Sequence, residues 1–229
     1  LEKMPELFYG RPLFKQQNHW KLTSMFTGII TTLGQIQRVI PSTVQVQVET
    51  GMRISIHAPE LGLEDVQIGD SIAINGACMT VVAKTTESFE VDVSFESLSK
   101  TVGLSTPGPV NLEKALRLQD RIGGHLTTGH VDGVGTVLKL EKISESWQLV
   151  VQIPKTLAGF CAVKGSITLN GVSLTINSVS DHAQGCDISV NLIPHTWTVT
   201  TLNLLKVGSK VNIEIDLIAR YLQRMLSLS

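Results

Sequence analysis

Short runs of alternating apolar and polar residues cover most of the chain after Met25. The segments 45–48 and 90–93 show the period-2 pattern of strands that bury one face. Asn75-Gly76 and Asn170-Gly171 each lie between two such runs, and Asn-Gly is the pair that two-residue hairpin turns favour. Because Val, Ile and Thr dominate the runs, the pattern predicts a protein that is mostly β.

Helical periodicity is confined to a few segments. We expect short helices near 61–63 and 115–119, and a longer one over 216–229. The last segment has apolar residues at 217, 218, 221, 222, 225 and 226, with Asp216 at the helix start, where an acidic side chain is favourable. This helix either closes the core of its own domain or packs against a partner chain. A terminal helix has few local strands to cover, which favours the partner.

Four blocks of the sequence recur in the same order, with offsets between 95 and 101 residues. The first-copy segments 27–34, 71–81, 96–101 and 110–113 match 128–135, 166–176, 195–200 and 211–214. A period this long suits one small β-barrel or sandwich and is too long for a solenoid unit. We therefore predict two copies of one β domain, over 25–118 and 119–215, with a linker at 118–122.

Composition and charge limit the functions open to this chain. Its 229 residues carry a net charge of −1, and no basic excess indicates a nucleic-acid or membrane partner. Three cysteines without Cys-x-x-Cys spacing argue against a disulfide framework and against a cysteine-rich zinc site. The chain has no run of about 18 apolar residues that would span a membrane. We expect a soluble, cytoplasmic protein that acts on a small molecule.

The first 24 residues lack both periodicities, and they also lack the apolar stretch of a signal peptide. We interpret 1–24 as an extension, added by cloning or by upstream translation, with Met25 as the natural start. The alternative is a natural start at Met4, with a short arm that docks on the surface.

Two small polar pairs occupy equivalent positions in the two copies. Cys78 and Thr80 share one strand face in the first copy, and Ser173 and Thr175 share the corresponding face in the second. Their thiol and hydroxyl groups suit a heteroaromatic ligand that is rich in carbonyls and ring nitrogens. Strand propensity alone also explains threonine here, but the duplication favours a ligand. Cys78 is a candidate nucleophile, although a lone cysteine in an apolar strand is more often inert.

The segment 123–133 combines four glycines with two histidines, His125 and His130. Histidine titrates near neutral pH, which makes it a natural general acid or base. A metal site is a weak interpretation, because only Asp132 is nearby as a third ligand. The alternative is a glycine-rich turn between the domains, with incidental histidines.

Six segments together resemble the riboflavin synthase family: 25–30, 75–80, 123–131, 170–175, 192–196 and 211–216. The resemblance implies two similar six-stranded β-barrels and a C-terminal helix through which three chains associate. It implies that two molecules of 6,7-dimethyl-8-ribityllumazine react without cofactor or metal. One donates a four-carbon unit to the other, giving riboflavin and 5-amino-6-(D-ribitylamino)uracil. The active site would lie between the N-terminal barrel of one chain and the C-terminal barrel of its neighbour.

The resemblance also assigns substrate-binding residues to each barrel. For the N-terminal barrel it implies Gly28, Ile29, Ile30, Ser71, Cys78, Met79, Thr80, Asp92, Val93, Ser94, Phe95, Glu96, Ser97, Gly129, His130 and Val131. For the C-terminal barrel it implies Lys164, Ser173, Leu174, Thr175, Leu192, Ile193, Pro194, His195, Thr196 and Trp197, with Asp216 as a further active-site acid.

The expected chemistry gives these groups different roles. The 7-methyl group of the lumazine is acidic because its carbanion delocalises into the ring, and we expect His130 to assist proton transfer there. Cys78 or Ser71 would add to or polarise the acceptor lumazine, while Ser173 and Thr175 would orient the donor. Holding two rings face to face would remove much of the entropic barrier.

Rival interpretations and one departure from the family remain. Trp197 and Thr198 stand where the family often has a leucine and an acid, at the rim of the C-terminal pocket. The first rival is a non-catalytic lumazine- or flavin-binding optical protein, in which the C-terminal pocket is degraded. Lys164, Ser173 and Thr175 persist here, which favours the enzyme. A flavin-reductase-type barrel would need a nicotinamide-binding motif, which the sequence lacks. A purely structural β protein gives no reason for the matched polar pairs.

Overall fold

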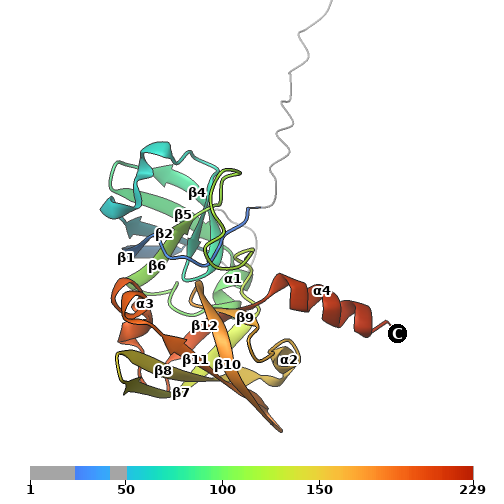
Figure 1. Ribbon diagram of the computed structural model, residues 1–229. Helices are drawn as coiled ribbons and strands as arrows, with labels where there is room; N and C mark the ends of the chain where they lie inside the picture. The colour runs from blue at the N-terminus through green and yellow to red at the C-terminus, as the bar shows by residue number, and fades with distance from the viewer. Residues whose placement is uncertain (1–23, 42–50, 229) are drawn as a thin grey trace, which may run out of the picture.

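The computed structural model describes residues 24–41 and 51–228, which form two closed β-barrels and a projecting helix (Figure 1). The prediction of an all-β fold with two tandem six-stranded barrels and a C-terminal helix is confirmed. The strand predicted at 45–48, and all but Ser24 of the interpreted extension, lie outside the described residues. No helix in the described part combines the length and apolar character that crossing a bilayer requires.

The strands divide evenly between the barrels. The first barrel contains β1 (Thr32–Pro41), β2 (Met52–His57), β3 (Ser71–Ile74), β4 (Ala77–Lys84), β5 (Ser88–Val93) and β6 (Gly108–Lys114). The second contains β7 (Gly133–Ile143), β8 (Ser146–Pro154), β9 (Ser166–Leu169), β10 (Val172–His182), β11 (Gly185–Leu192) and β12 (Lys210–Ile215). The helices are η1 (Pro59–Leu61), η2 (Leu63–Asp65), α1 (Phe95–Lys100), α2 (Lys155–Ala158), α3 (Pro194–Val199), η3 (Thr201–Leu204) and α4 (Leu217–Leu226).

The two barrels share one strand order and the same irregularities. Around the first barrel the order is β1-β2-β5-β4-β3-β6, and around the second it is β7-β8-β11-β10-β9-β12, with antiparallel pairing throughout. The pairing register shifts between Ile36 and Arg38 in β1 and between Val137 and Lys139 in β7. A β-bulge at the same place in both copies means that the sequence repeat is a repeat of the whole barrel.

Alternation along each strand separates a core face from an outer face. In β4, Met79 and Val81 belong to the first core, whereas Cys78 is half-buried and Thr80 is exposed. The equivalent strand β10 buries Leu174 in the second core by the same pattern. The prediction that each polar pair shares one strand face is therefore confirmed.

Both predicted Asn-Gly hairpins are present. Asn75 joins β3 to β4 with φ +48°, and Asn170 joins β9 to β10 with φ +49°. Asparagine tolerates this left-handed conformation better than most residues, and the following glycines take it without strain. The backbones of the two turns also touch, because a Cβ added to Gly76 would lie 2.7 Å from the amide nitrogen of Gly171.

The short helices agree only partly with the prediction. The turns η1 and η2 match the helix expected near 61–63. The helix expected over 115–119 is wrong: Leu116 donates its amide hydrogen to the carbonyl oxygen of Met25, so this segment runs beside the chain start. The prediction missed α1 and α3, which occupy equivalent places after β5 and β11. Six-residue helices are too short to show a 3.6-residue period.

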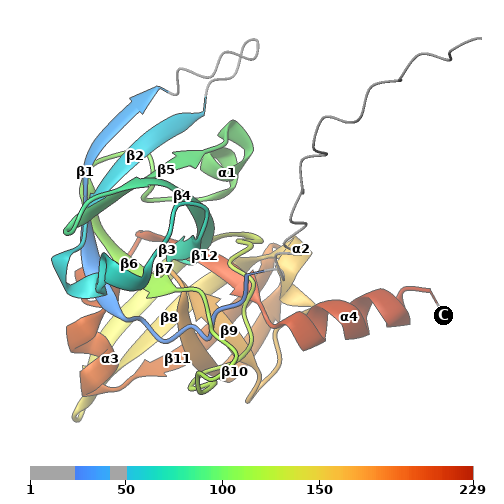
Figure 2. The ribbon, with the colours of Figure 1, turned by 90° about the horizontal axis from the view of Figure 1, so that it is seen from above.

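The C-terminal helix α4 begins as predicted. The Asp216 carboxylate accepts a hydrogen bond from the amide of Ile218 at 2.8 Å, which is the N-cap arrangement. The helix then projects from the second barrel and buries none of its residues (Figure 2). Its exposed apolar side chains include Tyr221, Leu222 and Met225. The interpretation that α4 closes the core of its own domain is therefore wrong.

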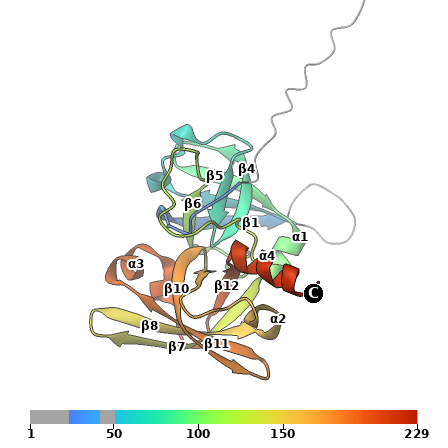
Figure 3. The same cartoon turned by 45° about the vertical axis from the view of Figure 1, so that its right-hand side comes forward.

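Four buried asparagines join the barrels, which stack one above the other in Figure 3. The side-chain amide of Asn111 donates to the carbonyl oxygen of Asn170 at 2.9 Å, and that of Asn212 donates to the carbonyl oxygen of Asn75 at 3.0 Å. The Asn212 side chain also bonds both backbone groups of Val102, accepting at 2.7 Å and donating at 3.1 Å. A side chain of each barrel thus hydrogen-bonds to a backbone carbonyl group in the hairpin of the other barrel.

Replacement of Asn212 by alanine is expected to destabilise the protein by about 3 kcal/mol, because three hydrogen bonds are lost and buried backbone groups remain unpaired. Chemical denaturation measures this loss. Asn177→Ala on the exposed face of β10 is the matched control and should leave the unfolding free energy nearly unchanged. Equal stabilities of the two variants would contradict a bridging role for Asn212.

Candidate functional site

The segment before each barrel lies on the other barrel. Phe26 and Thr127 exchange two backbone hydrogen bonds, of 2.9 and 3.1 Å, where the two segments cross. Beyond the crossing, the amide of Ser173 donates to the carbonyl oxygen of Gly28, and the amide of Cys78 donates to that of Gly129, both at 2.8 Å. Each polar strand face is therefore bordered by a segment from the other repeat.

Two glycines make this close contact possible. Gly28 and Gly129 both have φ +74°, in the left-handed region. A Cβ on Gly28 would lie 2.7 Å from Ser173 Cβ, and one on Gly129 would lie 2.6 Å from Cys78 Cβ. Any larger residue would push the segment off the strand.

This exchange corrects the predicted membership of the two pockets. Gly28 and Ile30 do not belong with Cys78 in the first barrel: Gly28 contacts Ser173, and Ile30 packs on the second core. Gly129 and Val131 lie on the first barrel, as expected. The repeat implies this crossing, because Gly28 is equivalent to Gly129 and the predicted sets place both on the first barrel.

Buried glutamates hold both crossing segments. Glu113 accepts hydrogen bonds from the amide and hydroxyl of Thr27 at 2.7 and 2.8 Å and from the amide of Gly28 at 3.0 Å. Glu214 makes the same three bonds, at the same lengths, to Thr128 and Gly129. Burial raises the pKa of both carboxyls, and these hydrogen bonds oppose that shift.

The second-barrel site contains a histidine that the prediction did not select. His125 Nδ1 lies 2.8 Å from the hydroxyl oxygen of Ser173, while its Nε2 is buried without a hydrogen-bond partner. Burial lowers the pKa of the imidazole, and the negative charge of Asp216 opposes this. His125 and Ser173 thus form one hydrogen-bonded polar pair, and the charge of Asp216 acts on it. The glycine-rich segment signalled both histidines, but no sequence pattern indicates which of them meets Ser173.

The first-barrel site has a different set of polar groups. The hydroxyl of Ser24 donates to that of Ser71 at 2.7 Å, and Ser71 is paired with Thr80 and lies beside Cys78 on the same hairpin. Burial raises the pKa of Cys78 even though Ser71 lowers it, so the group is a thiol at neutral pH. His130 is exposed at the edge of this site. A thiol without an activating base is a poor nucleophile, which favours a polarising role over addition.

Several predicted binding residues are available only through their backbone. Those whose side chains lie in a barrel core are Met79, Val93, Leu174 and Leu192. Asp92 instead forms a bidentate pair with Arg53, with distances of 2.8 and 2.7 Å, and this pairing lowers the pKa of its carboxyl.

The remaining predicted residues lie around α1 and α3. The hydroxyl of Ser94 caps α1 by accepting from the amide of Ser97 at 3.1 Å, and Phe95 and Glu96 form the exposed first turn. Ile193, Pro194 and His195 are likewise exposed at the start of α3, Thr196 is half-buried there, and Thr80, Lys164 and Thr175 are exposed on the barrel surfaces.

Trp197, the departure from the family pattern, has its own partner. Its ring stacks on Trp147 of β8 with centroids 4.2 Å apart and planes 3° from parallel. Lys142 lies 5.5 Å from the centroid of the Trp147 ring. One face of Trp197 is therefore covered by protein, and the pair fastens α3 to the wall of the second barrel.

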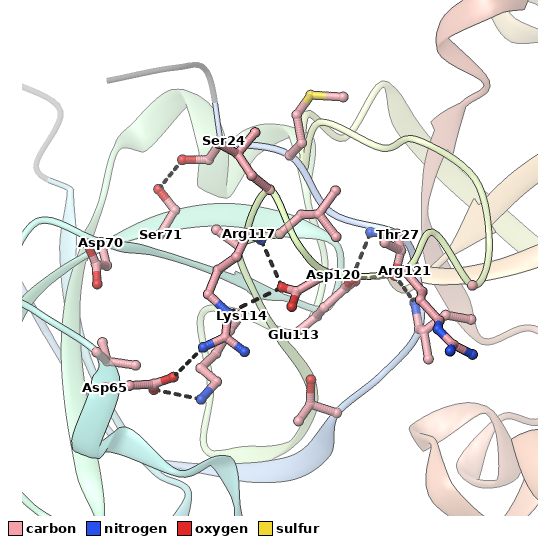
Figure 4. Close-up of a pocket in the computed structure, with 18 of the residues that line it drawn as sticks. Ser24, Thr27, Asp65, Asp70, Ser71, Glu113, Lys114, Arg117, Asp120 and Arg121 are labelled. Atoms are coloured by element: carbon pink, nitrogen blue, oxygen red, sulfur yellow. Dashed lines mark hydrogen bonds and ion pairs between the residues drawn. The ribbon is translucent and has the colours of Figure 1, made fainter. Parts of the chain in front are cut away.

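A cavity of about 780 Å³ lies beside the first-barrel site (Figure 4). From the predicted set, Ser71 and Ile29 line it, whereas Cys78 and Thr80 do not. Asp65 accepts from Lys114 at 2.8 Å and from Arg117 at 3.3 Å across one side of it. No cluster of three metal-binding side chains occurs here or elsewhere in the described part of the chain.

Comparisons with known proteins agree with this architecture. The lumazine binding domain family matches twice, at residues 27–115 and 128–216. Riboflavin synthase of Photobacterium phosphoreum is 40% identical over 204 residues, covering 88% of this chain and 89% of that protein. Riboflavin synthase of Bacillus subtilis (strain 168) is 38% identical, covering 88% and 90%.

Solved structures give the same result for the fold. The crystal structure of LumP complexed with 6,7-dimethyl-8-(1'-D-ribityl) lumazine superimposes with a TM-score of 0.68 at 27% identity, covering 83% of this chain and 98% of LumP. LumP complexed with riboflavin gives a TM-score of 0.69 with the same coverage. With two lumazine binding domains in tandem and relatives near 40% identity over most of its length, the chain belongs to the riboflavin synthase family.

Proposed function

We propose that this chain is an enzyme of riboflavin biosynthesis that converts two molecules of 6,7-dimethyl-8-ribityllumazine into riboflavin and 5-amino-6-(D-ribitylamino)uracil. The observation that carries the proposal is the pair of equivalent polar sites, one on each barrel, in a member of this family. A reaction between two identical molecules needs two similar binding sites, and the duplication provides them. The substrate supplies its own electron sink, so the reaction needs no cofactor or metal.

Equivalent positions in the two sites carry different chemical groups. His130 in the first site corresponds to Ile29 in the second, at an offset of 101 residues. Conversely, His125 corresponds to Ser24 at the same offset. One lumazine must lose a four-carbon unit and the other must gain it, so two identical substrates require unequal surroundings. This inequality supports separate donor and acceptor sites.

The proposed roles follow from the groups present. His130 assists removal of a proton from the 7-methyl group of one lumazine, and the carbanion delocalises into the ring. Ser173 and Thr175 orient the donor, with His125 holding the Ser173 hydroxyl and Lys164 and Asp216 supplying charge nearby. Ser71 and Cys78 polarise the acceptor. Hydrogen-bond donors of the protein that are directed at the ring carbonyls stabilise the delocalised negative charge.

We also propose that three copies of the chain associate through α4 and that the active site is shared between neighbours. An apolar stripe including Ile218, Tyr221, Leu222 and Met225 is at least half exposed in the single chain. Stripes of this kind mark protein interfaces. Ile193, at the second-barrel site, is also 54% exposed, as expected for a site that a neighbouring first barrel completes. We place the enzyme in the cytoplasm, where its three free cysteines would remain thiols.

The alternative is a protein that binds lumazine without converting it, a possibility that the LumP structures raise. Incubation of the purified protein with 6,7-dimethyl-8-ribityllumazine separates the two. We expect a riboflavin absorbance band to appear with turnover, in a 1:2 ratio to the lumazine consumed. A stable complex from which only lumazine is recovered would establish the alternative instead.

His130→Ala is expected to lower kcat about 100-fold, the lower range for loss of a general acid or base. Steady-state assays of riboflavin formation measure the effect. His182→Ala is the matched control, because His182 pairs with Asp187 on the β10–β11 hairpin and should not affect turnover. Full activity of the His130 variant would remove this residue from the proton transfer.

Leu222→Glu should break the proposed assembly, because it places a charge in the middle of the apolar stripe of α4. Light scattering should show a mass three times that of the chain for the parent protein and a smaller mass for the variant. Gln223→Glu adds the same charge one residue along and should keep the parent mass. If both variants keep the parent mass, α4 is not the contact.

A further inference from the structure

One carboxylate joins the His130 segment to the C-terminal helix. Asp132 Oδ2 accepts hydrogen bonds from the amide of Ile215 at 2.9 Å and from the guanidinium of Arg220 at 2.8 Å. The amide of Asp132 donates in turn to the carbonyl oxygen of Ile213 at 2.7 Å. Asp132 therefore contacts the end of β12 and the first turns of α4 at once, two residues after His130.

The first repeat shows that the barrel itself does not need this carboxylate. At the equivalent position, Thr31 donates its amide to the carbonyl oxygen of Leu112 at 2.8 Å, which reproduces the backbone bond of Asp132. Glu113 also holds the first crossing segment just as Glu214 holds the second. The carboxylate of Asp132 is thus a feature that the first repeat lacks, and it occurs in the repeat that is followed by the helix α4.

The direction of α4 depends on its first turns. The helix buries none of its own residues and extends away from both barrels (Figures 1 and 2). Asp216 caps its start, and Arg220 reaches back to Asp132 from the next turn. The Asp132 side chain is only 12% exposed and that of Arg220 is 39% exposed, so water screens this ion pair less than a surface pair.

We propose that Asp132 is a positioning residue whose ion pair with Arg220 connects α4 to the His130 segment. Association through α4 fixes the helix, the helix fixes Arg220, and Arg220 holds Asp132, which sets where His130 stands over the first barrel. The active His130 geometry is then tied to the assembled protein. The inference rests on the proposed function, in which α4 is the contact between copies and His130 serves the reaction.

Asp132→Thr, which installs the residue of the first repeat, and Arg220→Met test the connection in the full-length protein. Each should lower kcat about tenfold or more, with little change in KM, at concentrations where sedimentation velocity shows the parent mass. The double variant should be no worse than either single variant, because both remove one interaction. Arg220→Lys keeps the charge and should recover most of the activity.

Arg224→Met, the same change one turn further along α4, is the matched control and should retain the parent kcat. Values of kcat within twofold of the parent for both Asp132→Thr and Arg220→Met in the assembled protein would overturn the proposal. An equal loss in Arg224→Met would also overturn it, since the effect would then be general to the helix.

Histidine ring NMR provides a readout that does not need turnover. Arg220→Met in the assembled protein should move the His130 signal and leave that of His182 in place. An unmoved His130 signal would refute the connection even if the chain proved to be a binding protein. Absence of riboflavin formation by the parent protein, with the His130 shift present, would reject the proposed function and keep the connection.

Discussion

The exchange of segments between the two barrels depends on two buried carboxylates. Glu113 accepts three hydrogen bonds from Thr27 and Gly28, in the segment that contacts the second barrel. Glu214 accepts the same three from Thr128 and Gly129, in the segment that contacts the first barrel. Burial makes their ionised form unfavourable, and three donors at 3.0 Å or less offset part of that penalty. Without the two carboxylates, neither segment would be fixed where Gly28 meets Ser173 and Gly129 meets Cys78, and neither site would contain residues from both repeats.

The same interaction explains why the duplicated fold produces two sites and not two independent domains. Each barrel buries its own apolar core, but its polar face is completed by the other repeat. The asparagine network then fixes the distance between the barrels through the hairpins that precede these faces. Each site is therefore built from residues of both repeats, and neither barrel provides a complete site without the other's segment.

Local periodicity determined how much could be predicted from the sequence. Alternation located the strands, Asn75 and Asn170 marked the hairpins, and the 95–101-residue offset revealed the duplication. The crossing of Gly28 onto Ser173 was missed although the repeat implies it: once Gly129 is placed on the first barrel, the 101-residue offset places Gly28 on the second, whereas the predicted sets put both on the first. The stacking of Trp197 on Trp147 was also hidden, since the two residues lie 50 positions apart in sequence and no periodicity relates them.

Positions at which the two copies differ indicate function more clearly than positions at which they agree. Positions at which both copies agree, such as Glu113 and Glu214, serve the fold that the copies share. His125, His130 and Asp132 have no chemical counterpart in the first copy, where Ser24, Ile29 and Thr31 occupy the equivalent places. Two identical substrates in identical sites would react with no preference for direction. Residues that break the symmetry are thus where a duplicated chain would acquire a donor, an acceptor and a link to its own assembly.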